Sequence, residues 1–203
     1  MTCVIFGGAD IKDYSEVWVP EEAVVIAADR GYIHCKTLGI IPDALVGDFD
    51  SLEGELPCNV STVTAPCEKD DTDLIMAVRE GIKLCCTHFL IYGADGGRMG
   101  HTFANIQTLS FISAKGLTGE LRGKGFDMLV QVSGKRSYTN KGYRYVSVFS
   151  LTDSAQLSVK GLKYGGSFTL HRSYPMGVSN EFTGEGCEIT VHSGEILVIF
   201  EKE

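Results

Sequence analysis

Short apolar runs alternate with longer amphipathic stretches over the first two-thirds of the chain. Four mainly apolar runs, at 2–6, 23–28, 44–46 and 88–92, are each followed at once by Gly or Asp. They are too short for helices, and they lack the strict alternation of a strand that is exposed on one side. This pattern is typical of strands buried on both faces, as in a parallel sheet covered by helices.

Three stretches between these runs have helical periodicity. Residues 72–86 carry apolar side chains at intervals of four, and residues 102–114 repeat similar spacing. Residues 31–38 form a shorter candidate helix that ends at Gly39, a residue typical of helix ends. Strands that alternate with helices predict an α/β domain whose sheet is mostly parallel.

The pattern changes after about residue 134. Alternating apolar runs, as at 143–151 and 196–200, are separated by turns that contain glycine, and no helical stripe occurs. This predicts a smaller antiparallel β domain. Because residues 133–140 are rich in Ser, Gly, Lys and Asn, we place the linker there and divide the chain into 1–134 and 135–203.

Composition supports two small domains or one large one. The chain has 203 residues, of which 44% are hydrophobic and 22% are charged, as in ordinary soluble globular proteins. No apolar run approaches the roughly 20 residues that a bilayer span needs, and the segment 1–6 lacks the basic flank of a signal peptide. The seven cysteines include no Cys-x-x-Cys pair, so we expect reduced thiols and a cytoplasmic protein.

The charge balance limits the class of partner. The net charge is −8 and no basic tract occurs, which disfavours nucleic acid as a partner. An acidic protein can still bind an anionic ligand when a metal ion lies between them.

Acidic residues follow the predicted strands. Asp29 comes directly after the second apolar run, and Asp48 and Asp50 come after the third. Because ligands of such sheets bind at the carboxyl ends of the strands, these carboxylates predict a Mg²⁺ site. The alternative is that each is a turn former or a helix cap. We favour metal binding for these three, whereas Asp73 taken alone is better explained as a residue of a helix first turn.

The loop 93–98, Gly-Ala-Asp-Gly-Gly-Arg, lies between a predicted strand and a predicted helix. Small residues in such a loop allow backbone N–H groups to approach a phosphate, although a tight turn alone would also explain them. Arg98 and Lys69 could each bind a phosphate or be ordinary solvated surface residues. A lone histidine such as His101 is more often a capping or packing residue than a base, and we assign His34 to packing.

Several short motifs together resemble the thiamine pyrophosphokinase family, specifically its bacterial type. They match in order and spacing over essentially the whole chain. The motifs are Ala-Asp-Arg-Gly at 28–31, Gly-Asp-Phe-Asp-Ser at 47–51, Lys-Asp-Asp-Thr-Asp at 69–73, the loop 93–98 with His101 and Asn105, Gly-Leu-Lys-Tyr at 161–164, and Ser-Asn-Glu-Phe at 179–182.

The resemblance implies an N-terminal α/β catalytic domain, a C-terminal β-sandwich that contributes thiamine binding and dimerisation, and a homodimer with active sites at the subunit interface. The implied reaction is the transfer of a pyrophosphoryl group from ATP to thiamine, which gives thiamine diphosphate and AMP. Mg²⁺ is the implied cofactor.

Residue roles follow from the resemblance motif by motif. Mg²⁺ ligands would be Asp48, Asp50 and Asp73, which together with Asp70 would also be the catalytic carboxylates. Nucleotide contacts would come from Asp29, Lys69, Gly97, Arg98, His101 and Asn105. Thiamine contacts would come from Ser179 and Asn180.

One position departs from the family pattern. The family commonly has Asp before the histidine of Gly-Gly-Arg-x-Asp-His, whereas Gly100 stands there in this chain. This departure leaves open reduced activity or an altered nucleotide preference, and it motivates one alternative, a non-catalytic dimer that binds thiamine or nucleotide. A second alternative is a related pyrophosphokinase that acts on another alcohol, such as a hydroxymethyl pterin.

Overall fold

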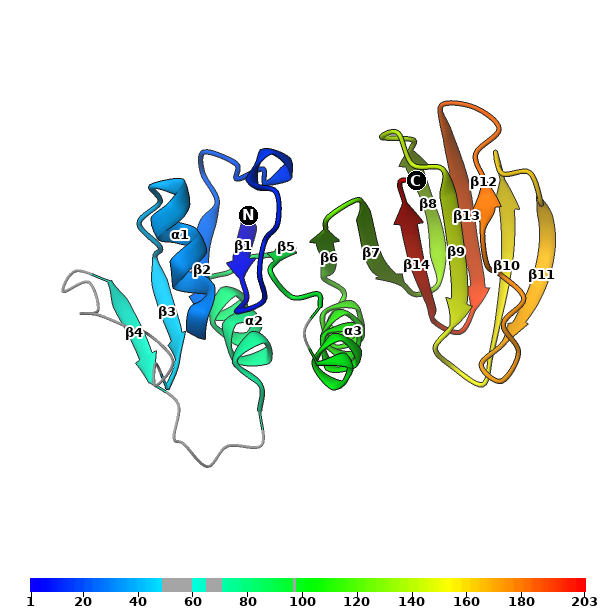
Figure 1. The fold of residues 1–203 in the computed structure, drawn as a ribbon. Helices are drawn as coiled ribbons and strands as arrows, with labels where there is room; N and C mark the ends of the chain where they lie inside the picture. The colour runs from blue at the N-terminus through cyan, green and yellow to red at the C-terminus, as the bar shows by residue number, and fades with distance from the viewer. Residues whose placement is uncertain (49–59, 65–70, 97) are drawn as a thin grey trace. The chain divides into compact units, whose positions relative to one another are not determined.

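The computed structural model describes residues 1–48, 60–64, 71–96 and 98–203. The chain forms two compact units, Met1–Lys124 and Gly125–Glu203 (Figure 1). Each unit is described by itself below. No helix in these described ranges is both long and apolar enough to cross a membrane.

The first unit contains a parallel sheet with the strand order β6-β5-β1-β2-β3-β4. Its strands are β1 (Thr2–Phe6), β2 (Val24–Ala28), β3 (Ala44–Gly47), β4 (Ser61–Thr64), β5 (His88–Tyr92) and β6 (Thr118–Gly123). Its helices are α1 (Tyr32–Leu38), α2 (Asp73–Lys83) and α3 (Met99–Ala114), with 3₁₀ turns η1 (Tyr14–Glu16) and η2 (Asp29–Gly31). The predicted α/β class is therefore confirmed.

Both faces of this sheet are buried. Val4 and Phe6 of β1 share a core with Cys35 of α1. On the opposite face, Gly81 of α2 lies against the side chains of Cys3 and Phe89. Because alternate residues of a strand point to opposite faces, helices must cover both faces, and this explains the continuous apolar runs in the sequence.

The second unit is a sandwich of two antiparallel sheets, ordered β12-β9-β14-β7 and β11-β10-β13-β8. Side chains from the two sheets, such as Val146 and Val198 from one and Leu157 and Ile189 from the other, share one core. The strands are β7 (Phe126–Gln131), β8 (Gly134–Thr139), β9 (Tyr145–Ser150), β10 (Ser154–Lys160), β11 (Gly166–His171), β12 (Asn180–Glu181), β13 (Gly186–Ser193) and β14 (Ile196–Glu201).

The segment expected as a linker, 133–140, instead contains strand β8, which pairs with β13. β8 is the edge strand of its sheet, and natural edge strands often carry Lys and other polar residues that discourage further pairing. That is why its composition resembles a linker. The division of catalytic and vitamin-binding roles between 1–134 and 135–203 stays a prediction.

Candidate functional site

The loops that follow β1 and β5 lie against each other at the carboxyl edge of the parallel sheet. Gly7 donates its backbone N–H to the carbonyl of Tyr92 (2.8 Å), and Ala9 donates to the carbonyl of Gly93 (2.9 Å). A Cβ on Gly7 would lie only 2.5 Å from the Gly93 oxygen, so glycine is required for this close approach. The two loops therefore form one tightly packed structure.

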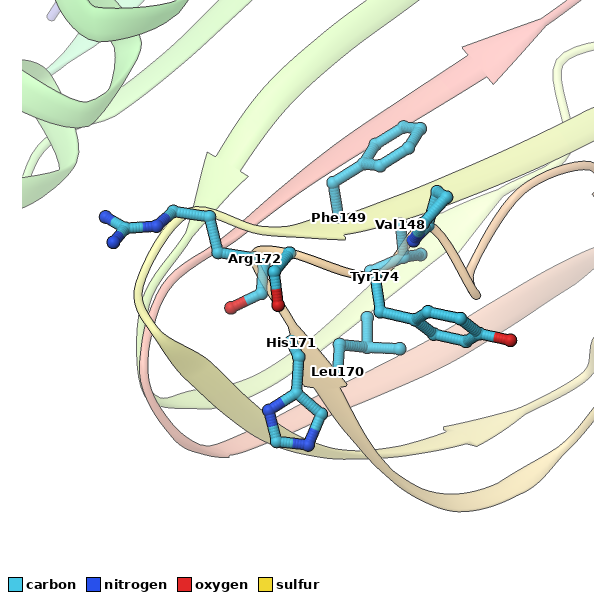
Figure 2. A pocket seen from close by; sticks show the side chains of 9 residues that line it. Val148, Phe149, Leu170, His171, Arg172 and Tyr174 are labelled. Carbon is cyan, nitrogen blue, oxygen red and sulfur yellow. The ribbon is translucent and has the colours of Figure 1, made fainter.

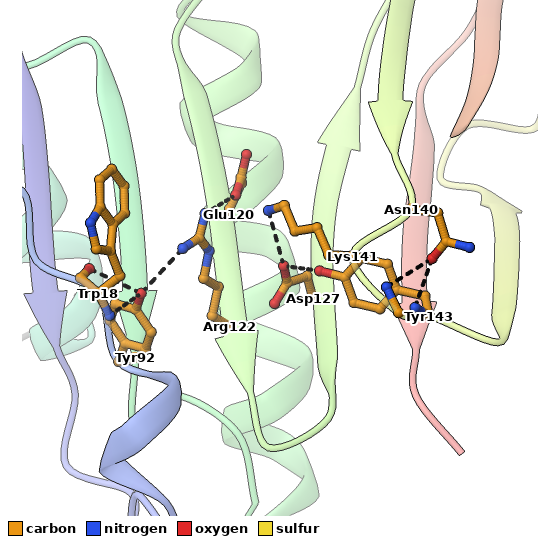
Figure 3. A network of polar contacts seen from close by, with 9 residues as sticks. Trp18, Tyr92, Glu120, Arg122, Asp127, Asn140, Lys141 and Tyr143 are labelled. Carbon is orange, nitrogen blue, oxygen red and sulfur yellow. Dashed lines mark hydrogen bonds and ion pairs between the residues drawn. The ribbon is translucent and has the colours of Figure 1, made fainter. Parts of the chain in front are cut away.

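Tyr92, the last residue of β5, is held by its side chain as well as by its backbone (Figure 3). Its hydroxyl donates to the Trp18 carbonyl (3.2 Å) and accepts from the backbone N–H of Trp18 (3.2 Å) and from Arg122 (3.3 Å). Arg122 also forms an ion pair with Glu120 (2.9 Å), in which both side chains are largely buried. These contacts fix the end of the strand that leads into the glycine-rich loop. A separate network in the second unit joins Tyr143, Asp127, Lys141 and Asn140 (Figure 3).

Asp29, at the end of β2, has an unusual environment. Its φ of 48° lies in the left-handed region, a strained conformation that a non-glycine residue holds only where its surroundings impose it. Burial raises the pKa of its carboxyl group, and the negative charges of Asp73 and Asp48 raise it further. Its buried Oδ1 atom has no hydrogen-bond partner among the described residues.

The carboxylates of Asp48 and Asp73 reach the same edge from two other elements. Asp48 follows β3 directly, and Asp73 is the first residue of α2, which is capped by the hydroxyl of Thr72 accepting the Ile75 N–H (3.3 Å). A Cβ added to Gly47, the residue before Asp48, would lie 3.3 Å from the Asp29 Cα, so the ends of β2 and β3 lie against each other. The grouping of Asp29, Asp48 and Asp73 as a metal site stays a prediction.

These acids suit a hard cation. A buried oxygen without a donor, beside two further carboxylates, is the environment that a divalent ion with oxygen ligands would relieve. Asp50 and Asp70 lie outside the described residues, as do Lys69 and Gly97. Among the residues that are described, no three acidic, His or Cys side chains complete a metal site by themselves.

The glycine-rich loop leads into α3, which carries the other predicted nucleotide residues. Arg98 immediately precedes the helix and His101 lies in its first turn, and both side chains are exposed. Asn105 instead donates its side-chain amide to the carbonyl of Ala94 (2.6 Å), within the loop. A Cβ on Gly100 would meet nothing within 4 Å. Steric crowding therefore does not explain why this chain has glycine where the family pattern has aspartate.

In the second unit, Asn180 begins the short strand β12, and Ser179 directly precedes it. The Asn180 amide accepts the backbone N–H of Tyr164 (3.0 Å) and donates to the carbonyl of the same residue (2.9 Å). Ser179 has a positive φ of 57° and donates its backbone N–H to the hydroxyl of Ser147 (3.1 Å). The amide of Asn180 thus holds Tyr164, whose side chain is exposed. Sequence reasoning did not single out this role.

A cavity of about 120 Å³ also lies in the second unit (Figure 2). Val148 and Leu170 are among its buried lining residues, and His171, Arg172 and Tyr174 are exposed. None of the predicted site residues lines it.

Two family models match the chain. "Thiamin pyrophosphokinase, catalytic domain" matches residues 15–118, and "Thiamin pyrophosphokinase, vitamin B1 binding domain" matches residues 136–196. Thiamine pyrophosphokinase of Bacillus subtilis is 28% identical over 167 residues, which is 76% of this chain and 74% of that protein.

Solved structures show the same fold. The thiamine pyrophosphokinase structure from Bacillus subtilis matches with a TM-score of 0.92 at 23% identity and covers 100% of both chains. The one from Geobacillus thermodenitrificans has a TM-score of 0.87 at 23% identity, covering 100% of this chain and 98% of that one. The one from Candida albicans has a TM-score of 0.78 at 15% identity, covering 100% and 90%.

Proposed function

The chain belongs to the thiamin pyrophosphokinase family of enzymes, and we propose that it transfers a pyrophosphoryl group from ATP to the hydroxyethyl oxygen of thiamine. The products are thiamine diphosphate and AMP. The observation that carries the proposal is the buried Oδ1 of Asp29, which has no hydrogen-bond partner within the described part of the chain, together with the negative charges of Asp73 and Asp48, which raise the pKa of its carboxyl group. The match to a vitamin B1 binding domain supports thiamine, rather than a hydroxymethyl pterin, as the acceptor.

Asp48, Asp50 and Asp73 are the residues that would hold Mg²⁺. When bound, the ion neutralises charge on the phosphates of ATP. The support is the buried Oδ1 of Asp29, which lacks a hydrogen-bond partner among the described residues, and an acidic edge with which a triphosphate alone would be mutually repulsive. Asp29 adds to the negative charge of that edge.

The reaction needs a group to orient the thiamine hydroxyl and to take its proton. We assign this to Asp73 or Asp70. The hydroxyl oxygen attacks the β-phosphorus of ATP, the bond from that phosphorus to the α–β bridging oxygen breaks, and AMP leaves with the electron pair. The proton passes to the carboxylate. Catalysis then consists mainly of positioning and charge stabilisation.

The loop 93–98 and the start of α3 would bind the nucleotide phosphates. Small residues in such a loop allow backbone N–H groups to approach a phosphate, and a helix N-terminus favours an anion. Arg98, exposed at this helix start, supplies a guanidinium group for a phosphate, with His101 beside it. Asn105 acts through its hydrogen bond to Ala94.

Ser179 and the segment held by Asn180 would bind thiamine. The Tyr164 side chain is 62% exposed, so its ring is available to a flat cationic ligand. We also propose a homodimer with active sites at the subunit interface, as the sequence resemblance implies. Light scattering should then give twice the mass of one chain; a monomer that is fully active would exclude this assembly.

The direct test is a product assay with ATP, Mg²⁺ and thiamine. Thiamine diphosphate and AMP should form in equal amounts, and Asp48→Asn should abolish turnover while the circular dichroism spectrum stays unchanged. A hydroxymethyl pterin serves as the parallel acceptor. Formation of ADP with thiamine monophosphate, or faster turnover of the pterin, would contradict the proposal.

A further inference from the structure

His34 of α1 is buried, with only 5% of its surface exposed, yet both of its ring nitrogens have polar partners. Nε2 lies 2.9 Å from the carbonyl oxygen of Ala9, and Nδ1 lies 2.7 Å from the hydroxyl of Tyr14. A carbonyl oxygen can only accept, so Nε2 carries the proton and Nδ1 accepts from the tyrosine. Two hydrogen bonds therefore fix the ring and its tautomer.

The contact of His34 continues into the glycine-rich loop. Ala9, which accepts from His34, donates its own N–H to the carbonyl of Gly93 (2.9 Å). Gly93 has a φ of 60°, and a Cβ added to it would lie 3.2 Å from His34 Nε2 and 2.9 Å from the Ala9 oxygen. The imidazole thus packs against Gly93, the residue at which β5 turns into the loop. We call His34, Tyr14 and Ala9 the His34 brace.

The loop is held from its other end by α3. Asn105 donates to the carbonyl of Ala94, the residue after Gly93, at 2.6 Å. Consecutive loop residues are therefore tied to two different helices, α1 through the His34 brace and α3 through Asn105. A loop that binds phosphate with backbone N–H groups needs such support, because a shift of a fraction of an ångström weakens every one of those contacts.

We propose that His34 is a positioning residue for nucleotide binding, which sets the backbone of residues 93–96 through Ala9. The inference rests on the proposed function, since it takes the loop as the phosphate site. A histidine that merely filled the core would need no donor at Nε2, whereas this role needs that donor specifically. If His34 only fills space, no substitution should depend on where its donor lies. If the Nε2–H donor is needed, only an amide that reaches the position of Nε2 should replace it.

The test compares two amides of different reach. The amide nitrogen of His34→Gln can take the place of Nε2, while the shorter amide of His34→Asn reaches only the place of Nδ1. We expect His34→Gln to keep the KM for ATP close to that of the wild type. His34→Asn should raise it about five- to tenfold, the factor that corresponds to one buried hydrogen bond, with the KM for thiamine unchanged.

A matched control lies at the opposite edge of the same sheet. The Nδ1 of His88, at the start of β5, is 2.6 Å from the hydroxyl of Thr118. His88→Gln removes a comparable imidazole hydrogen bond away from the loop, because its longer amide takes the place of Nε2 and leaves the place of Nδ1 empty, and it should leave the KM for ATP unchanged. Amide hydrogen exchange gives a readout without turnover: His34→Asn should speed exchange at Ala9, and His88→Gln should not.

A binding measurement separates failure of the proposed function from failure of the His34 brace. Calorimetry with a non-hydrolysable ATP analogue and Mg²⁺ tests the site itself: wild-type protein that binds no analogue overturns the proposed function. Wild-type binding together with equal affinity in His34→Asn overturns the brace alone, as does an equal loss in both amide variants. If His34→Asn does not fold, Tyr14→Phe decides, because it removes only the hydrogen bond that holds the ring at Nδ1. It should raise the KM for ATP more than His88→Gln does, and an equal KM in these two variants would overturn the brace.

Discussion

The side-chain amide of Asn180 holds the backbone of Tyr164 at both its N–H and its carbonyl. This pair of hydrogen bonds joins the start of β12 to the turn after β10. In the proposed function Asn180 therefore acts on thiamine through Tyr164, because its amide oxygen and one of its two N–H groups bind the Tyr164 backbone.

Asn180→Asp should weaken thiamine binding. Aspartate still accepts the Tyr164 N–H, but it loses the donor and places a negative charge beside a carbonyl oxygen. We expect the KM for thiamine to rise about tenfold, with little change in that for ATP. Asn140→Asp is the control, because Asn140 accepts from Gly142 and Tyr143 through its oxygen alone. Equal effects of the two substitutions would contradict the positioning role.

Asp29→Asn should lower the activity of the protein and raise its thermal stability. Asparagine removes a buried charge whose carboxyl pKa is already raised by burial and by the charges of Asp73 and Asp48. We expect a higher Tm at neutral pH and a fall in kcat/KM of about 100-fold or more, as when an active site holds a strained residue. A lower Tm with full activity would show that the acid is structural.

Gly100→Asp should stabilise α3 and alter nucleotide binding. Glycine within a helix costs about 1 kcal/mol relative to alanine, and an acid in the first turn gains roughly 0.3–1 kcal/mol; a Cβ here has open space. We therefore expect a higher Tm and a changed KM for ATP. Gly100→Ala should raise the Tm by a similar amount, because alanine has the highest helix propensity, but it should leave the KM unchanged. An unchanged KM in both variants would mean that the missing carboxylate has no role.

The pH dependence of stability should contain a contribution from His34. Burial lowers its pKa, and Arg30 lowers it further, against the opposing effects of the Ala9 hydrogen bond and Asp10. The contribution is complete above the unfolded value of about 6.5. It is lost as the pH falls from there towards the lowered folded pKa, because the unfolded chain binds the proton first. Urea unfolding between pH 7.5 and 5 should show a smaller slope for His34→Gln; identical slopes would contradict this.

Thiol labelling should follow burial. Burial raises the pKa of Cys35 to about 12 and that of Cys187 to about 11, whereas Cys85 is exposed just after α2. Because the thiolate is the reactive form, iodoacetamide should modify Cys85 in the native protein and reach Cys35 and Cys187 only in denaturant. Peptide mass spectrometry resolves the sites, and early labelling of Cys35 would contradict its burial.

The sequence by itself determined the architecture of the first unit and the edge at which its acids meet. β1 and β5 have the predicted bounds, 2–6 and 88–92, because a strand buried on both faces is recorded in a local apolar run. The meeting of Asp29 with Asp48 followed from topology alone, since parallel neighbouring strands end at the same edge.

Only the tertiary structure decided what the polar side chains do. His34 meets Ala9 across 25 residues of chain, Asn180 meets Tyr164 across 16, and Tyr92 meets Trp18 across 74. No local periodicity records such partners, because a hydrogen bond depends on where two distant segments are brought by packing. The same reason explains β8: its polar composition reads as a linker until its pairing with β13 makes it the edge of a sheet.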